Sequence, residues 1–344
     1  MVYDRNIDEL LKEYGQDIRK FADMCVETGK RKDYVQGGGG NTSVKLSDTL
    51  MAVKASGSHL SDVNERFGYS VVDYQRAHRQ IAELGEFDGR LVTVEGISNS
   101  KASIEVGLHA LLGKYVLHTH SMYVNLAACN RMGREIVQKA AGELGMEIIY
   151  IPYRNPGMEL MNTTRAALAE AGGWESAVLI LENHGIFVSG NDAVYCIDIH
   201  ERINRWFSEF FHCYPKDYPD VRVYALPDGG LVSGTSLLKK RLKKGDLTER
   251  FFTEDCIVFP YQRPYLYGNI EFVKGEPRNP QAKCLIYPAE GQIEYRATPG
   301  QAATLEETMC YVIGIYDAVT AAGYQVKALS PEDIAYIDSL QVLI

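Results

Sequence analysis

The chain has 344 residues, and its 36 lysines and arginines against 45 aspartates and glutamates give a net charge of −9. An acidic surface repels a phosphate polyanion, so nucleic acid is not expected as a partner. Hydrophobic residues make up 46% of the chain and charged residues 24%, which is typical of a globular protein with a sizeable core.

The first predicted element is a long amphipathic helix over residues 7–28, because apolar side chains recur there every three or four positions until Gly29. A polar linker and the run Gly37–Gly40 follow. Two β-like runs at 42–46 and 51–54 then predict a hairpin. Further on, the pattern predicts a short strand at 91–94 and a short helix at 105–112.

Strands and helices alternate through the next hundred residues. The β-like runs are 114–120, 146–150, 177–181 and 185–188. The helical patterns are 123–129, 158–171 and a long one that Asp192 caps and that continues to Phe210. This alternation predicts one compact α/β layer structure.

The composition changes at Tyr214–Pro219, and we expect a domain over 1–225 and a smaller C-terminal α+β domain over 226–344. In the second domain, β-like pieces near 256–259 and 282–287 precede a helix over 305–322. The basic run Lys239–Lys244 alternates with leucines, which indicates a solvated helix face rather than an anion site.

No apolar run approaches the roughly 18–20 residues of a membrane span, and the N-terminus lacks the apolar segment of a signal peptide. The seven cysteines include no Cys-x-x-Cys pair and are interpreted as reduced thiols. We therefore expect a cytoplasmic protein without a membrane partner.

Three histidines are candidates for a metal site. His118 and His120 lie two apart in a predicted strand, so their side chains project from the same face. His184 lies at the exposed end of a buried strand, where Gly185 permits an unusual backbone angle. Three neutral imidazoles suit Zn²⁺ and leave one coordination position open for a substrate. The alternatives are two unrelated histidines at a strand end and a turn histidine bonded to backbone.

Glu105 opens the predicted helix at 105–112. It is either an acid or base beside the metal or a first-turn carboxylate that the helix dipole favours. His109 lies one turn further along the same face and could hydrogen-bond Glu105. For His109 we favour a packed histidine over a ligand.

Two turns are rich in hydrogen-bond donors. Asn41 and Ser43 follow the glycine run, which lacks the lysine of a Walker loop and precedes a strand rather than the helix of a dinucleotide site. Ser56 and Gly57 form the second turn, after Lys54. Together with the helix start these turns predict a cradle for a polyhydroxy compound or a phosphate; a plain flexible connection is the alternative.

Five motifs follow one another along the chain: Gly40-Asn41-Thr42-Ser43, Ser56-Gly57, Ser103-Ile104-Glu105-x-x-x-His109, His118-x-His120 and Asn183-His184-Gly185. In these motifs and their order the chain resembles the class II aldolase/adducin-head family, which includes the L-fuculose-phosphate and L-rhamnulose-phosphate aldolases and L-ribulose-phosphate 4-epimerase. It looks most like the aldolase part of bifunctional rhamnulose-phosphate aldolase/dehydrogenase chains. The resemblance covers residues 7–211, and the C-terminal unit resembles the tail of those longer aldolase parts more weakly.

The resemblance implies a three-layer α/β/α head with a largely antiparallel central sheet, assembled as a homotetramer with sites at subunit contacts. It implies that His118, His120 and His184 hold Zn²⁺ or another divalent transition metal, and that Glu105 is the catalytic acid/base. It also implies substrate phosphate contacts from Asn41, Ser43, Ser56, Gly57 and Ser103.

Two departures from the family pattern leave the substrate open. Ile104 replaces a second serine, which removes one phosphate donor, and Ala102 stands where proline is common. The substrate is therefore a sugar phosphate or a non-phosphorylated sugar acid or hydroxy-keto acid. Lys54 could replace the lost phosphate contact.

The expected reaction is a metal-dependent retro-aldol cleavage of a ketose phosphate or related hydroxy-carbonyl compound, through an enediolate that Zn²⁺ stabilises. A Schiff base on Lys54 or Lys101 is the rival route. Tyr153 is a candidate for a second acid/base. The alternatives are a 4-epimerase, a metal-dependent decarboxylase and a non-catalytic adducin-like interaction module.

Overall fold

The computed structural model describes residues 6–83, 92–94, 97, 102–103, 105–173, 175–244, 252–253 and 270–340. The chain divides into two compact units. Unit 1 consists of Met1–Ala128 and Gly133–Phe207, and unit 2 of Cys129–Met132 and Ser208–Ile344. The division lies before the expected boundary near residue 225, because Phe210 and Phe211 already place their rings against Tyr324, 6.1 and 5.7 Å between centroids.

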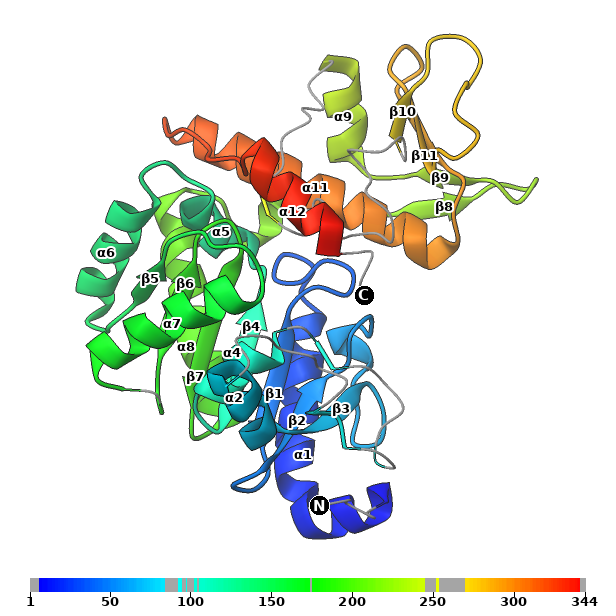
Figure 1. Cartoon of the computed structure of the whole chain (residues 1–344). Coiled ribbons are helices and arrows are strands. Elements are labelled where there is room, and N and C mark those ends of the chain that lie inside the picture. Colours follow the sequence, from blue (N-terminus) through cyan, green and yellow to red (C-terminus); the bar gives the residue numbers. More distant parts are fainter. Residues whose placement is uncertain are drawn as a thin grey trace. The chain divides into compact units, whose positions relative to one another are not determined.

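Unit 1 is built on a seven-stranded sheet with the order β3-β2-β1-β4-β7-β6-β5 (Figure 1). Among the described strand pairs of this sheet, β5–β6 is parallel and the others are antiparallel, so the expected largely antiparallel sheet is confirmed. The strands are β1 (Asn41–Lys45), β2 (Leu50–Lys54), β3 (Tyr69–Asp73), β4 (Tyr115–Thr119), β5 (Ile149–Ile151), β6 (Val178–Leu181) and β7 (Gly185–Gly190).

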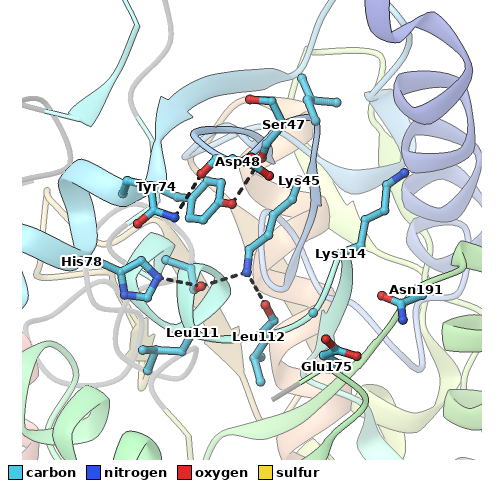
Figure 2. A pocket seen from close by; sticks show the side chains of 14 residues that line it. Lys45, Ser47, Asp48, Tyr74, His78, Leu111, Leu112, Lys114, Glu175 and Asn191 are labelled. Atoms are coloured by element: carbon cyan, nitrogen blue, oxygen red, sulfur yellow. Dashed lines mark hydrogen bonds between the residues drawn. The ribbon is translucent and has the colours of Figure 1, made fainter. Parts of the chain in front are cut away.

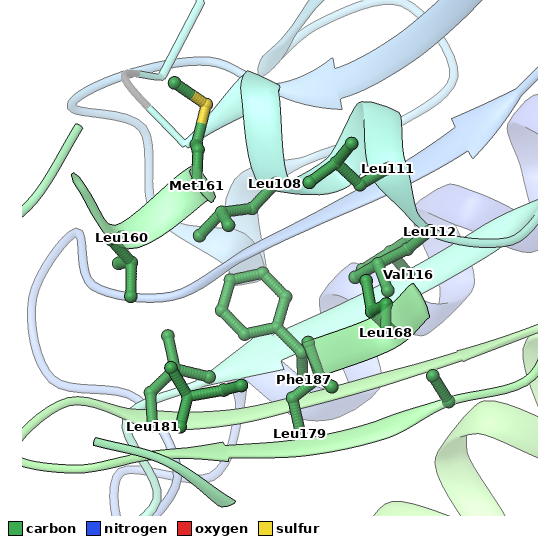
Figure 3. Close-up of a cluster of buried hydrophobic side chains, with 12 residues drawn as sticks. Leu108, Leu111, Leu112, Val116, Leu160, Met161, Leu168, Leu179, Leu181 and Phe187 are labelled. Atoms are coloured by element: carbon green, nitrogen blue, oxygen red, sulfur yellow. The ribbon is translucent and has the colours of Figure 1, made fainter. Parts of the chain in front are cut away.

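One face of this sheet carries α2 (Tyr74–Glu83), α4 (Val106–Leu111) and α7 (Met158–Ala171). Side chains two apart along the strands point to this face and pack on leucines of α4 and α7. Figure 3 shows the cluster, which joins Leu108, Leu111, Val116, Leu160, Met161, Leu168, Leu179, Leu181 and Phe187. A second cluster joins β2 and β3 to α2 and α4 through Met51, Val53, Val72, Ala77 and Val106.

The opposite face is covered by α1 (Ile7–Gly29) and α8 (Ala193–Phe210), which completes the three layers. Cys25 of α1 bonds Thr42 of β1, and Cys196 of α8 bonds the backbone of β4 at Tyr115. The remaining described helices of unit 1 are η1 (Leu60–Asp62), α5 (Met122–Ala128) and α6 (Gly133–Leu144). The α/β/α architecture therefore agrees with the sequence prediction.

Unit 2 has a five-stranded sheet with the order β10-β11-β12-β9-β8, and the long helix α11 shares its core. Its strands are β8 (Val223–Ala225), β9 (Leu231–Ser233), β10 (Ile270–Phe272), β11 (Cys284–Tyr287) and β12 (Gln292–Tyr295). Its helices are η2 (Pro215–Asp217), α9 (Ser236–Lys244), α11 (Pro299–Ala321) and α12 (Pro331–Leu340). Unit 2 is thus α+β, as expected.

Two sequence predictions for this unit differ in outcome. In α9, Leu238 is buried while Lys239 and Lys240 are exposed, which agrees with a solvated basic face. The strand expected near 256–259 lies outside the described residues.

None of the helices in the described ranges combines the length and the apolar character that crossing a membrane requires.

Candidate active site

Strand pairing brings the three histidines to one end of the unit 1 sheet. His118 pairs with Asn41 of β1 on one side and with Phe187 of β7 on the other. His120 follows the last residue of β4, and His184 lies in the turn between β6 and β7. Because β4 and β7 are antiparallel neighbours, the end of β4 meets the start of β7 and hence this turn.

The ligand atoms of His118, His120 and His184 all lie within 4.8 Å of one another. The two Nε2 atoms of His118 and His120 are 3.0 Å apart. The His184 ring centroid lies 5.0 Å from each of the other two centroids. All three side chains are buried. His184, which is far from the other two histidines in the sequence, therefore joins them in one cluster.

The turn that carries His184 depends on two unusual neighbours. Asn183 has a φ of +55°, and its backbone N–H donates to the Ala128 carbonyl at 3.0 Å. A Cβ on Gly185 would clash with the Thr119 carbonyl oxygen. The expectation that Gly185 supplies the unusual backbone angle was wrong: Asn183 adopts it, and Gly185 is needed for the close approach of β4.

The orientation of His118 is set by contacts on two sides. Its Nδ1 lies 2.9 Å from the Ile186 carbonyl, which can only accept, so Nδ1 carries the proton and Nε2 keeps its lone pair. Its ring stacks on Phe187 with centroids 3.9 Å apart. Burial holds the pKa of His118 well below its usual value although Glu105 opposes this. His118 is therefore a neutral imidazole with Nε2 turned toward the other two rings.

Glu105, the residue before α4, faces the histidine cluster. Its Oε1 lies 3.1 Å from Nε2 of His184 and 3.4 Å from Nε2 of His118. Burial raises the pKa of this carboxyl group, but the hydrogen bond with His184 lowers it, and the pKa lies well below its usual value. A carboxylate thus lies beside the cluster, in the place expected for an acid/base.

A chain of hydrogen bonds behind Glu105 connects α4 to β1. Asn41 Nδ2 donates to Glu105 Oε2 at 2.5 Å, and the side-chain oxygen Oδ1 of Asn41 accepts from His109 Nε2. The other ring nitrogen of His109 bonds the Ser43 hydroxyl at 2.8 Å. Burial lowers the pKa of His109 to about 4, so the ring is neutral. His109 therefore reaches Glu105 through Asn41, whereas the sequence suggested a direct bond.

The five residues expected at a phosphate occupy two different environments. Ser43 and Asn41 are buried, 0% and 3% exposed, and their polar groups are bonded to His109 and Glu105. Ser56 and Gly57 are exposed in the turn after β2. Their strand meets the Ser103 segment through a bridge between Ala55 and Ala102, and Ser103 Oγ lies 3.4 Å from Asn41 Nδ2. The structure thus brings the Ser56 turn next to Ser103.

The remaining residues singled out in the sequence have other placements. Lys54 is 3% exposed, and its ammonium group donates to the Gly38 carbonyl at 2.6 Å, so it holds the glycine run. Lys101 and Ile104 lie outside the described residues. The backbone N–H of Tyr153 donates to Glu182 at 2.9 Å, and its hydroxyl lies 3.5 Å from Asn155.

A polar cavity of about 570 Å³ lies at the other end of the same strands (Figure 2). It is lined by Lys45 at the end of β1 and by Lys114 before β4, whereas the histidines lie at the Asn41 end of β1. Lys45 donates to the carbonyls of Ala110, at 3.0 Å, and Leu112. The cavity is therefore distinct from the histidine cluster.

The donor set of the cluster fits a divalent transition metal. Two nitrogens bound to one tetrahedral Zn²⁺ are about 3.3 Å apart, because each Zn–N bond is about 2.0–2.1 Å. The 3.0 Å between His118 and His120 is close to this spacing. Phe187, which orients His118, was missed from the sequence; its position opposite His118 in the β4–β7 register is the signal that identifies it.

Fold and site together define a three-layer α/β/α protein with a histidine cluster and an adjacent carboxylate at one end of its sheet. The sequence matches the family described as "Class II Aldolase and Adducin N-terminal domain" over residues 19–209. The chain belongs to this family.

Two relatives match a little over half of the chain. A 3-oxo-tetronate 4-phosphate decarboxylase of Haemophilus influenzae is 26% identical over 204 residues, which are 55% of this chain and 86% of the relative. An L-fuculose phosphate aldolase of Methanocaldococcus jannaschii is 25% identical over 185 residues, 52% and 86% respectively.

A solved structure of an N-terminal class II aldolase domain from Thermoplasma acidophilum is also similar. It is 24% identical, with a TM-score of 0.48, over 56% of this chain and 93% of that one.

Proposed function

We propose that the chain is a metal-dependent lyase that cleaves a carbon–carbon bond of a hydroxy-carbonyl sugar derivative by a retro-aldol reaction. The observation that carries this proposal is the position of Glu105 Oε1 within 3.4 Å of two histidines of the buried three-histidine cluster. Such a pairing of an open metal site with a carboxylate suits proton transfer at a carbon next to a carbonyl group. The two relatives are an aldolase and a decarboxylase, and both names describe carbon–carbon cleavage.

His118, His120 and His184 would hold Zn²⁺ or another divalent transition metal. When bound, such a cation supplies Lewis acidity, which polarises a carbonyl group and stabilises negative charge on its oxygen. The neutral state of His118 supports this assignment, because a protonated imidazole cannot coordinate a cation.

Glu105 is proposed to return a proton to the donor carbon in cleavage and to remove it in synthesis. Asn41 holds Oε2, so Oε1 is the oxygen left to transfer the proton. Asn41 in turn is oriented by His109, whose two ring nitrogens are hydrogen-bonded to the Ser43 hydroxyl and to the Asn41 side-chain oxygen. The buried Asn41 and Ser43 would thus act by positioning Glu105.

The anionic end of the substrate is proposed to bind at Ser56, Gly57 and Ser103. The Ser56 turn is exposed and lies beside the Ser103 segment, which also supports Glu105 by accepting its backbone N–H at 3.2 Å. A phosphate or carboxylate held there would place the carbonyl end of a short sugar near the histidines.

The proposal also includes a homotetramer located in the cytoplasm. Sedimentation velocity of the purified protein measures its oligomeric state.

Decarboxylation of a 3-oxo sugar acid is the second candidate. It needs the same stabilised negative charge, and the relative from Haemophilus influenzae carries this activity in its name. Epimerisation at the fourth carbon would use the same cation and carboxylate, whereas a non-catalytic interaction module would need no cation at the histidines.

One experiment separates these candidates. The Zn²⁺-loaded protein is incubated with L-ketose 1-phosphates, a 3-oxo-tetronate 4-phosphate and their non-phosphorylated forms, and aldehyde, CO₂ and epimers are quantified. Aldehyde release supports the aldolase, and CO₂ release selects the second candidate. A protein that binds no Zn²⁺ and turns over none of these compounds would contradict both enzymes and favour an interaction module.

A further inference from the structure

His120 directly follows β4, the strand that contains His118. Its two neighbours in the chain, Thr119 and Ser121, carry hydroxyl groups that are both bonded to side chains of α8. The polar side chains of α8 therefore hold the backbone on both sides of His120.

We propose that His200 and Asn204 of α8 are positioning residues that fix His120 by binding the hydroxyl groups on either side of it. This inference rests on the proposed metal site. Thr119 Oγ1 lies 2.8 Å from His200 Nε2, and the Ser121 hydroxyl donates to Asn204 Oδ1. His200 and Asn204 are one helical turn apart, and Asn204 Nδ2 donates to the His200 carbonyl at 2.8 Å.

This polar network is buried. The side chains of Thr119, Ser121, His200 and Asn204 are each at most 1% exposed. Buried polar groups are costly unless they are hydrogen-bonded, and apolar residues of similar volume would fill the same space without that requirement. The hydrogen bonds therefore fix the positions of these side chains more narrowly than packing of apolar residues would.

The network also extends to the helix after His120. Ser121 Oγ accepts the backbone N–H of Tyr123 at 3.2 Å, at the start of α5. The Tyr34 ring meets His200 edge-on with centroids 4.8 Å apart. Burial lowers the pKa of His200 to about 3, so the ring stays neutral and can serve as a fixed hydrogen-bond partner. Positioning by α8 thus reaches both sides of His120.

The test is the Zn²⁺ affinity of the full chain, measured by competition with a chromophoric chelator. Thr119→Val keeps the shape and removes the hydroxyl group, and Asn204→Leu removes the other anchor. We expect each variant to bind Zn²⁺ about 10–100-fold more weakly, as is usual when groups supporting a ligand are lost. The absorption bands of Co²⁺ bound in place of Zn²⁺ should shift, since His120 would no longer be held in one position.

Two matched variants separate positioning from a general loss of stability. Thr119→Ser keeps the hydroxyl and should restore the affinity. Ser189→Ala removes another hydroxyl that is 1% exposed and accepts the Ala177 N–H, at the far end of β7, and should leave the affinity unchanged.

Folded Thr119→Val and Asn204→Leu proteins with the wild-type affinity and Co²⁺ spectrum would overturn the inference and leave the proposed metal site standing. A wild-type protein that binds neither metal would remove the metal site itself. If Asn204→Leu does not fold, the isosteric Thr119→Val decides alone.

Discussion

The two carboxylate oxygens of Glu105 have different neighbours, and this difference determines which oxygen can exchange a proton with a substrate. Oε2 accepts from Asn41, while Oε1 faces the nitrogens of His118 and His184. An unrestrained carboxylate would rotate and present either oxygen. Asn41, held by His109, limits that rotation, so a single oxygen is presented toward the cluster.

Glu105→Gln tests the acid/base role. We expect kcat to fall by about 10²–10⁴-fold, because an amide cannot exchange the proton, while the Zn²⁺ content stays at the wild-type level. Turnover and metal content of the same preparation provide the measurement. Glu170→Gln, an exposed position on α7, serves as the control. Unchanged turnover in the Glu105→Gln protein would remove this carboxylate from proton transfer.

Gly185→Ala tests the close approach of β7 to β4. An added Cβ would clash with the Thr119 carbonyl, so the backbone must shift at the turn that carries His184. We expect a loss of about 1–3 kcal/mol in the free energy of unfolding, measured with urea, together with weaker Zn²⁺ binding. Gly142→Ala in α6, where a Cβ meets nothing within 4 Å, should instead stabilise by about 0.5–1 kcal/mol. Equal effects of the two changes would contradict this explanation.

The sequence predicted the residues of the cluster better than their surroundings. The spacing of His118 and His120 is local, so the alternation of a strand was enough to place both on one side. Burial of Asn41 and Ser43 beneath His109 depends on how β1 meets α4, which no local pattern specifies. For the same reason, the stacking of Phe187 and the bonds from α8 become visible only once the strand register is known.

Among the elements, α4 connects the candidate site to the cavity of Figure 2. It has six residues, begins after Glu105 and ends beside Lys45 and His78. His78 Nε2 and the Lys45 ammonium both bond the Ala110 carbonyl at 3.0 Å. A helix this short has little stability of its own, so contacts at its two ends hold it on the sheet.

Lys45→Met removes the contact at the C-terminal end of α4. The carbonyl of Leu112 would lose its bond to the ammonium group, and we expect a loss of about 1–3 kcal/mol in the free energy of unfolding. Hydrogen exchange of the α4 amides should also become faster. Lys139→Met, at an exposed position on α6, is expected to change stability by less than about 0.5 kcal/mol. Unaltered exchange in α4 would contradict a role for Lys45 in holding it.

Several of the elements, among them the two longest helices, were predictable from the sequence. The helix expected at 7–28 is α1 and the expected hairpin is β1–β2. The helix expected at 305–322 is α11, which begins earlier, at Pro299, and ends at Ala321. Sequence patterns did not reveal β3, α2 and α6, nor β8 and β9, which have three residues each. β8 and β9 are too short to show an alternating pattern, and they form a strand pair because neighbouring strands complete their hydrogen bonds.

For the whole molecule, buried neutral histidines predict acid sensitivity. Burial lowers the pKa of His109 to about 4 and that of His200 to about 3, below the ordinary 6.5. Below pH 6.5 the unfolded chain therefore binds protons that the folded chain does not. The free energy of unfolding consequently decreases as the pH is lowered. This loss continues to about pH 4 for His109 and about pH 3 for His200.

At about pH 5 each of these histidines should lower the free energy of unfolding by about 2 kcal/mol relative to neutral pH. Urea unfolding of the metal-free protein at about pH 7.5 and about pH 5 measures the sum. His200→Gln, which cannot be protonated, should show a smaller decrease over the same interval. An equal decrease in both proteins would contradict a contribution from His200.

Unit 2 is formed by two separate segments of the chain, Cys129–Met132 and Ser208–Ile344, so a single cut cannot separate the two units cleanly. The backbone of Cys129–Met132 is bonded to residues 325–327, through Arg131 N–H to the Gln325 carbonyl and Lys327 N–H to the Cys129 carbonyl. Cutting the gene after residue 207 would expose these groups to water directly after α5, the helix whose Asn125 supports His184. A shortened chain that ends there would therefore lack the partners of two backbone groups in 129–132, so the preceding helix α5 is expected to be less well held at its C-terminal end.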